Sequence, residues 1–380
     1  MWHRPSESSR ASHREHLPAV ALAAVCALGL ALNIWIALLN QTGLGVDFNQ
    51  FYSASRLAGT GHLYDWDALR KIEAENGLEV PTGRLPVVIY GYRIFGGLPY
   101  TAARATWMVL SIAALAAFAA WWPGARPQWM GAALAWSLPV TFVILFGQDV
   151  PFWLMFFAMA LVLLERKKEW SAGVVFSLCI CKFHLALGIP ILLVARKCWK
   201  TLIGGAIGVS VWIGASFLLE GPGWPMAYLK MSHMPTFSPA ADRMPNVYGI
   251  ASWIPWTSAA EVAGGIAVAL LLWTVCRRGG TGLGMAGAAA AACGVLLGHH
   301  SYAGDCALLI PLTVLTVQRP GAPRWLKIWA VATLTPAPVL LLLSNRPLLA
   351  QLWIAAFVVT AVWLGRGKAP DVPAPAYNEG

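Results

Sequence analysis

Long apolar runs separated by short polar segments dominate the chain. A hydrocarbon layer of roughly 30 Å needs about 20 apolar residues in each spanning helix. Runs of about this length, most with Lys or Arg near an end, predict ten spanning helices, near residues 17–39, 102–122, 129–146, 150–165, 201–219, 254–276, 281–298, 304–318, 326–343 and 348–364. The pattern therefore predicts an all-α, polytopic integral membrane protein.

One apolar segment does not fit simple alternation across a membrane. Residues 171–195 have basic clusters at both ends and carry Lys182 and His184 in the middle. A single span would leave one basic cluster outside, whereas two half-helices turning around Lys182, Phe183 and His184 keep both clusters inside. Non-helical backbone at this depth must be covered by protein or by a watery cavity. We therefore predict a re-entrant helical hairpin within a bundle of about 10–11 transmembrane helices, with Lys182 facing a cavity.

The longest polar segment, residues 40–101, is predicted to form the first extracytoplasmic loop. Asp47 is followed three positions later by the amide of Gln50, which is typical of a residue that caps a helix N-terminus. Aromatic residues at helical spacing predict a helix over about 48–58, and a second amphipathic pattern predicts another helix that begins near Trp66 and ends at Asn76-Gly77. We expect both helices to lie in the membrane interface, with the aromatic side chains of the first among the headgroups.

Composition supports a membrane protein and argues against nucleic-acid binding as the reason for the net positive charge. The 380-residue chain is 58% hydrophobic and only 12% charged, which excludes an ordinary soluble domain. Its net charge of +10 is explained by basic residues in cytoplasmic loops, so no nucleic-acid partner is expected. We predict a cytoplasmic tail at 1–16, a transmembrane domain at 17–365 and a disordered cytoplasmic tail at 366–380, in an inner membrane of bacterial type.

Neither a leader peptide nor a disulfide framework is indicated. The first apolar run is about as long as a span and lacks a small-x-small cleavage site, so it is predicted to be a retained anchor. The seven Cys lie in predicted spans, the re-entrant segment or cytoplasmic segments. Cys179 and Cys181 with His184 lack a fourth metal ligand. No metal site and no cofactor are therefore assigned.

Four polar segments are predicted to converge on the extracytoplasmic side: the first loop, residues 146–149, residues 220–252 and residues 298–305. Motifs in and between these segments follow in the order Asp47-Phe48-x-x-Phe51-Tyr52-x-Ala54-x-x-Leu57, Gly61-x-Leu63-Tyr64-Asp65, Gly147-Gln148-Asp149, Ala172-Gly173 followed by Lys182 and Pro190, Asn246-x-x-Gly249, and His299-His300 leading to Asp305 and Leu308-Leu309-x-Pro311-Leu312. This order of motifs resembles glycosyltransferase family 87, the polyprenol-phosphate-mannose-dependent mannosyltransferases of the GT-C membrane class.

Two departures from the family pattern bear on specificity. The family carries a Tyr-Pro-Pro element in the first loop where this chain has Leu85-Pro86-Val87, and an Asn after the Gly-Gln pair where this chain has Asp149.

The resemblance implies a GT-C-like bundle that transfers a sugar, most simply mannose, from a polyprenyl monophosphate to an acceptor hydroxyl on a glycolipid or glycan, with inversion. It implies Asp47 as the catalytic base, with the ordinary ionisation of an Asp. The leaving phosphate needs cationic or hydrogen-bonding neighbours, for which Lys182, His299 and His300 are the candidates, with Arg84, Arg93 and Arg243 as alternatives. The candidate substrate-binding residues are Gln148, Asp149, Lys182, Asn246, His299, His300, Tyr302 and Asp305.

Alternatives remain for both the residues and the function. Asp47 and the pair Gln148-Asp149 can simply cap helices, Lys182 can pair within the bundle, and the His pair can be interfacial. A multi-pass transporter or flippase of a lipid-linked substrate would also use broken helices with buried charge, but usually as symmetry-related pairs. An inactive partner in polysaccharide assembly is a third possibility.

Overall fold

The computed structural model describes residues 7–39, 45–77, 79–234, 237, 240–278 and 280–365, with side chains from Ala23 onward. Every regular element in these ranges is helical, which confirms the all-α prediction. The elements are α1 (Glu7–Leu39), α2 (Val46–Leu57), α3 (Trp66–Glu73), α4 (Pro86–Gly96), α5 (Tyr100–Trp121), α6 (Pro127–Trp136), α7 (Leu138–Phe146), α8 (Val150–Glu165), α9 (Glu169–Ser177), η2 (Leu178–Leu185), α10 (Gly188–Ala195), α11 (Trp199–Glu220), α12 (Trp224–Ser232), η3 (Ala241–Arg243), α13 (Val247–Ala251), α14 (Thr257–Cys276), α15 (Leu283–Leu297), η4 (Ala303–Leu309), α16 (Ile310–Gln318), α17 (Arg324–Leu334), α18 (Ala337–Leu343) and α19 (Pro347–Gly365).

Each apolar run predicted to span coincides with a helix or with a pair of helices. Four helices, α5, α11, α14 and α19, are long and apolar enough to cross a membrane, and the count rises to six if each of two bent pairs is one span. The pairs are α6 with α7, bent by 73°, and α17 with α18, bent by 55°. The remaining predicted spans correspond to shorter apolar helices, at Ala23–Leu39, Val150–Glu165, Leu283–Leu297 and Ala303–Gln318.

The spanning helices predicted near 129–146 and 326–343 are each interrupted by a bend. Pro139 lies in the first turn of α7, and Pro336 precedes α18. A proline has no N–H for the helix ladder and disfavours helical backbone in the residue before it. In both segments the helix therefore breaks, although the pattern of apolar residues alone predicts one continuous helix.

The predicted re-entrant hairpin is present and consists of α9, η2 and α10. Lys182 has non-helical backbone angles, with φ −132° and ψ 68°. Gly173 of α9 meets the backbone of Thr201 and Gly205, and Ser177 meets Gly208, so α9 and α11 run in the same direction. The chain between them must therefore reverse, which brings the basic ends of the hairpin to one end of the bundle.

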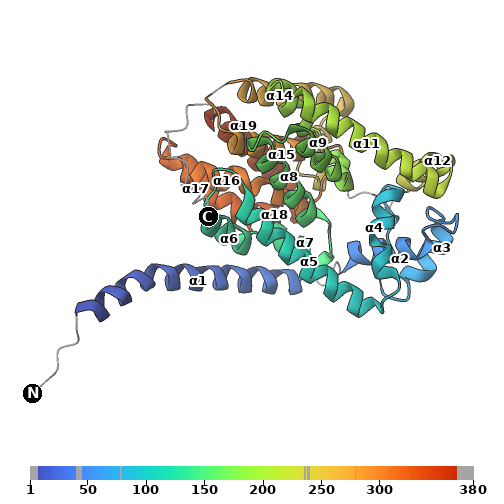
Figure 1. The fold of residues 1–380 in the computed structure, drawn as a ribbon, viewed down its shortest axis with the longest axis horizontal. Helices are drawn as coiled ribbons and strands as arrows, with labels where there is room; N and C mark the ends of the chain where they lie inside the picture. The colour runs from blue at the N-terminus through green and yellow to red at the C-terminus, as the bar shows by residue number, and fades with distance from the viewer. Residues whose placement is uncertain are drawn as a thin grey trace, which may run out of the picture.

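The helices of the first loop form a separate group at one end of the bundle, beside α12 (Figure 1). Inside this group, Phe48, Phe51 and Tyr52 of α2 are at most 5% exposed and pack against α4 and α5. The expectation that these aromatic side chains lie among headgroups is therefore wrong. The helix that covers them, α4, begins at Pro86 and was not predicted, because its apolar pattern is short and follows a turn.

The structure describes only part of the predicted tails. Helix α1 begins at Glu7, within the segment predicted as the cytoplasmic tail at 1–16. Residues 1–6 and the predicted tail at 366–380 lie outside the described residues.

Glu73 closes the loop that leads from α3 towards α4. Its Oε2 accepts a hydrogen bond from the Val80 backbone N–H at 2.7 Å, and its carbonyl accepts one from the Asn49 amide at 3.1 Å. Burial raises the pKa of the Glu73 carboxyl to about 8, and the hydrogen bond from Val80 opposes this shift. The folded loop therefore favours the protonated carboxyl.

We expect Glu73→Gln to make thermal stability less dependent on pH. A folded-state pKa above the ordinary value gives stability that is complete below about pH 4.5 and is lost as pH rises through about 8. Thermal unfolding in detergent at about pH 5.5 and 8.5 should show the wild type losing about 2–4 °C more than the variant. An equal change in melting temperature with pH for Glu73→Gln and wild type would show that Glu73 is ionised in the folded loop. Glu75→Gln, an exposed neighbour, is the control.

Candidate active site

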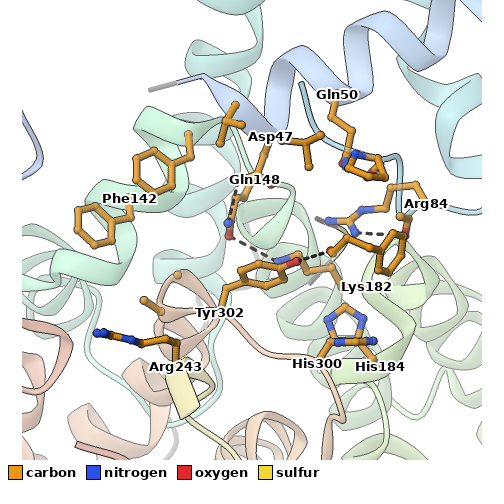
Figure 2. A pocket seen from close by; sticks show the side chains of 18 of the residues that line it. Asp47, Gln50, Arg84, Phe142, Gln148, Lys182, His184, Arg243, His300 and Tyr302 are labelled. Carbon is orange, nitrogen blue, oxygen red and sulfur yellow. Dashed lines mark hydrogen bonds between the residues drawn. The ribbon is translucent and has the colours of Figure 1, made fainter. Parts of the chain in front are cut away.

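A cavity of about 740 Å³ opens at the end of the bundle where the first loop lies (Figure 2). All four polar segments predicted to converge contribute to its wall, together with the turn of the re-entrant hairpin. The predicted site residues that line it are Asp47, Gln148, Lys182, His299, His300 and Tyr302. Asp149, Asn246 and Asp305 lie outside the lining and support it from behind.

Asp47 lies in the first turn of α2 and faces the cavity. The residue that precedes α2 is Gly45, whose φ of 76° turns the chain into the helix and which makes no side-chain cap. One carboxylate oxygen of Asp47, Oδ2, accepts a hydrogen bond from Gln148 Nε2 at 3.0 Å. The interpretation of Asp47 as a helix cap is therefore wrong, and the carboxylate is directed at the cavity instead.

The ionisation of Asp47 also differs from the expected ordinary behaviour. Burial raises its pKa above the usual Asp value, while the Gln148 hydrogen bond and the charges of Lys182 and Arg84 oppose the shift. A carboxylate with a raised pKa is a stronger base, which is the property that proton abstraction needs.

Gln148 connects Asp47 to Lys182. Its Oε1 lies 3.5 Å from Lys182 Nζ, while its Nε2 donates to Asp47. An ammonium only donates and an ionised carboxylate only accepts, so the two neighbours fix the orientation of the amide. The turn before it requires Gly147, whose φ is 81° and whose carbonyl accepts a hydrogen bond from Trp107 Nε1 at 2.9 Å.

Behind the cavity wall, two cations are paired with two buried carboxylates. Lys182 Nζ lies 2.5 Å from Asp305 Oδ1 and 4.0 Å from Asp149 Oδ1. Arg84 forms a bidentate salt bridge with Asp149, in which Nε and Nη2 donate to the two carboxylate oxygens at 2.7 and 3.0 Å. The side chains of Asp149, Asp305 and Lys182 are at most 2% exposed. Such pairs satisfy the charges and hold both cations at the edge of the cavity.

Asp305 also orders the segment that carries Tyr302. Its Oδ2 accepts a hydrogen bond from the Tyr302 backbone N–H at 2.7 Å. The Tyr302 ring lies 6.0 Å from Lys182 Nζ, and its hydroxyl donates to the Phe237 carbonyl at 3.2 Å. Lys182 and Tyr302 thus form one side of the cavity (Figure 2).

The histidines occupy different environments. His299 Nδ1 lies 2.6 Å from Glu261 Oε1, and its ring packs against Tyr248. Burial, with a smaller effect of neighbouring His299, lowers the pKa of His300, which favours a neutral ring near neutral pH. Of the two roles expected from the sequence, cationic or hydrogen-bonding, His300 is therefore better suited to hydrogen bonding. His184, at the hairpin turn, also lines the cavity.

Asn246 holds the polypeptide that bears the His pair. Its Oδ1 accepts from the Gly249 N–H at 2.7 Å, and its Nδ2 donates to the carbonyls of Gly298 and His299 at 2.6 and 3.1 Å. The side chain is fully buried. Asn246 therefore holds the backbone of the segment that bears the His pair and does not itself line the cavity.

Among the alternative cations, Arg84 and Arg243 line the cavity, whereas Arg93 is exposed and packs on Tyr90. Arg243 Nη1 donates to the carbonyls of Leu342 and Ser344 at 3.1 and 2.6 Å. The Arg84–Asp149 pair was missed in the sequence because its members are 65 positions apart. The replacement of the family's Asn by Asp149 was the available signal, since a buried carboxylate needs a cation.

We expect Gly147→Ala to destabilise the site. A Cβ at Gly147 would clash with Phe48 Cβ, and the positive φ disfavours any L side chain. We expect a loss of about 1–3 kcal/mol, measured by thermal unfolding in detergent. Gly131→Ala, where a Cβ meets nothing within 4 Å on helix α6, is the control and should be neutral or slightly stabilising. Equal melting temperatures for the two variants would show that α2 moves away without cost.

Comparison with known proteins gives one family. The model of glycosyltransferase family 87 matches residues 86–301, more than half of the 380-residue chain. The matched segment includes Gln148, Lys182 and His300 and begins after Asp47. No curated protein and no solved structure matches the chain.

Proposed function

The chain belongs to glycosyltransferase family 87, and from this premise we propose that it transfers mannose from a polyprenyl monophosphate to a glycolipid or glycan hydroxyl, with inversion. The membership and the apolar helices make the protein a membrane glycosyltransferase. The family match favours this class over a transporter or flippase. The sugar, the lipid carrier and the acceptor are the parts of the proposal that need experiment.

The observation that carries the proposal is the arrangement of charge around the cavity. Asp47 has one oxygen held by Gln148, which leaves the other available to a substrate. Lys182 and Arg84 lie beyond Gln148, held by Asp305 and Asp149. A base and two cations at separate positions in the lining of one cavity suit an inverting transfer to a hydroxyl, because the acceptor and the leaving group occupy opposite faces of the sugar.

In the proposed reaction, the acceptor hydroxyl gives its proton to Asp47 and its oxygen forms a bond to the anomeric carbon of mannose. The bond from that carbon to the phosphate oxygen breaks, and the bonding electrons leave with the polyprenyl phosphate. Lys182 and Arg84 stabilise the growing charge on the phosphate, and His184 and His300 supply further polar contacts. A phosphate leaving group needs no general acid, and this scheme requires no metal.

The scheme assigns the substrates to the membrane. A lipid-borne donor enters through the bilayer, so a nucleotide-binding loop is not required. We propose an inner-membrane location with both termini in the cytoplasm and the cavity on the extracytoplasmic face, following the distribution of basic residues.

Purified protein in detergent with a membrane lipid extract tests this proposal. Labelled mannose should pass from polyprenyl-phosphate mannose to a lipid or glycan product, and a nucleotide-linked mannose should not replace the donor. Transfer from the nucleotide donor alone would refute the lipid-linked mechanism. Movement of labelled donor between the leaflets of proteoliposomes, without any glycosidic product, would support a flippase instead.

A further inference from the structure

A second hollow, of about 510 Å³, lies between the re-entrant hairpin and α11. Its wall is almost entirely apolar and includes Ile180, Pro190, Leu202, Ala206 and Ile213. We call it the hairpin groove. From Leu202 to Ile213, α11 rises by about 16 Å, which is about half the thickness of a hydrocarbon layer.

The packing of the hairpin explains why the groove is there. Helix α9 approaches α11 closely, because Gly173 meets Gly205 and Ser177 meets Gly208. The returning helix α10 instead packs on α15, where Gly188 meets Ala290. The two halves of the hairpin thus have different partners, and the groove opens between them and α11.

The groove adjoins the polar cavity at the hairpin turn. Phe183 lines both hollows and is 44% exposed. Leu85, which also lines the groove, directly follows Arg84 in the sequence, as Phe183 follows Lys182. Each residue at the junction is therefore adjacent to a cation of the cavity wall.

We propose that the hairpin groove holds the part of the donor's isoprenoid chain nearest the phosphate. This inference rests on the proposed function, since it assumes a lipid monophosphate donor. With the phosphate at Lys182 and Arg84, the chain attached to it continues past Phe183 into an apolar channel.

The position of the junction favours the donor's chain over an acyl chain of a lipid acceptor. The acceptor hydroxyl must reach Asp47, which is separated from Lys182 by Gln148. The leaving group occupies the opposite face of the sugar in an inverting reaction. A chain that enters beside the cations is therefore joined to the leaving phosphate.

Filling the groove tests the assignment. Ala206→Trp places a large ring in the groove, and Ile207→Trp, one residue further along α11, places it on an exposed surface outside the groove. We expect Ala206→Trp to raise KM for a long-chain polyprenyl-phosphate mannose by about tenfold or more, because apolar contacts are lost. KM for a five-carbon isoprenoid analogue, which is too short to fill a groove of about 16 Å, should change much less. Ile207→Trp should leave both values unchanged.

An equal effect of Ala206→Trp on both donors, or no effect on either, would overturn the assignment. A binding experiment separates this result from a failure of the proposed function. A photoactivatable polyprenyl phosphate without sugar should label groove residues in the wild-type protein, and unlabelled polyprenyl phosphate should compete. Equal competition by a diacyl phospholipid would show that the groove holds ordinary membrane lipid only. Competed labelling in the absence of mannose transfer would leave the groove assigned and the transferred sugar wrong.

Discussion

Asp47→Asn is expected to lower mannose transfer by about 10²–10⁴-fold, the range typical of a lost general base. An amide has nearly the same shape but does not accept a proton, so acceptor deprotonation is lost while α2 keeps its place. Donor KM should change little, because the base acts on the acceptor. The measurement is initial-rate transfer of labelled mannose by wild type and variant at equal concentrations of folded protein.

Asp65→Asn is the matched control for Asp47→Asn. Asp65 lies in the same loop, is exposed and caps α3 through hydrogen bonds that an Asn side chain can also accept. It should retain transfer. Undiminished transfer by Asp47→Asn would assign Asp47 to holding Gln148 alone. The wild-type rate should also fall at acidic pH with a midpoint above the ordinary Asp pKa, because burial raises the pKa of Asp47.

Lys182→Met is expected to cost both stability and activity. It leaves the fully buried carboxylate of Asp305 without its cation at 2.5 Å, and breaking a buried pair costs about 3–5 kcal/mol. Loss of a charge that stabilises the leaving phosphate should lower transfer by about 10²–10³-fold. Thermal unfolding and transfer should be measured on the same preparation.

A double variant separates the two effects of Lys182. Lys182→Met with Asp305→Asn removes both charges, and the Asn oxygen can still accept the Tyr302 N–H. We expect much of the lost stability to return while transfer stays low. A stable double variant with wild-type transfer would reduce Lys182 to a structural partner of Asp305. Lys230→Met, on the exposed surface of α12, controls for loss of a Lys.

The sequence was most informative where a physical requirement is strict. Apolar length located the apolar helices, of which four to six are long enough to span a membrane. The two basic clusters around Lys182 required a reversal of the chain that the structure contains. It was less informative where contacts join distant segments. The helical spacing of Phe48, Phe51 and Tyr52 predicts an apolar face on this helix. It does not predict which helices pack against that face, and in the structure these are α4 and α5.

The candidate site illustrates the same distinction. Residue type and order brought Asp47, Gln148 and Lys182 into one hypothesis, yet the sequence allowed Asp47 to be a cap. The carboxylate's real partner is 101 positions away, so no local pattern records it. The neutral state favoured for His300 depends on burial, which exists only in the folded molecule.

The hydrogen bond between Asp47 and Gln148 also constrains how the protein is made. Asp47 leaves the ribosome long before Gln148, and its helix is enclosed by α4, α5 and the turn at Gly147. The segment that carries Asp47 must therefore wait for later helices to insert before it reaches its final position. A chain released before residue 149 would contain Asp47 and Arg84 but neither Lys182 nor the re-entrant hairpin, so truncated products would not act as partial enzymes.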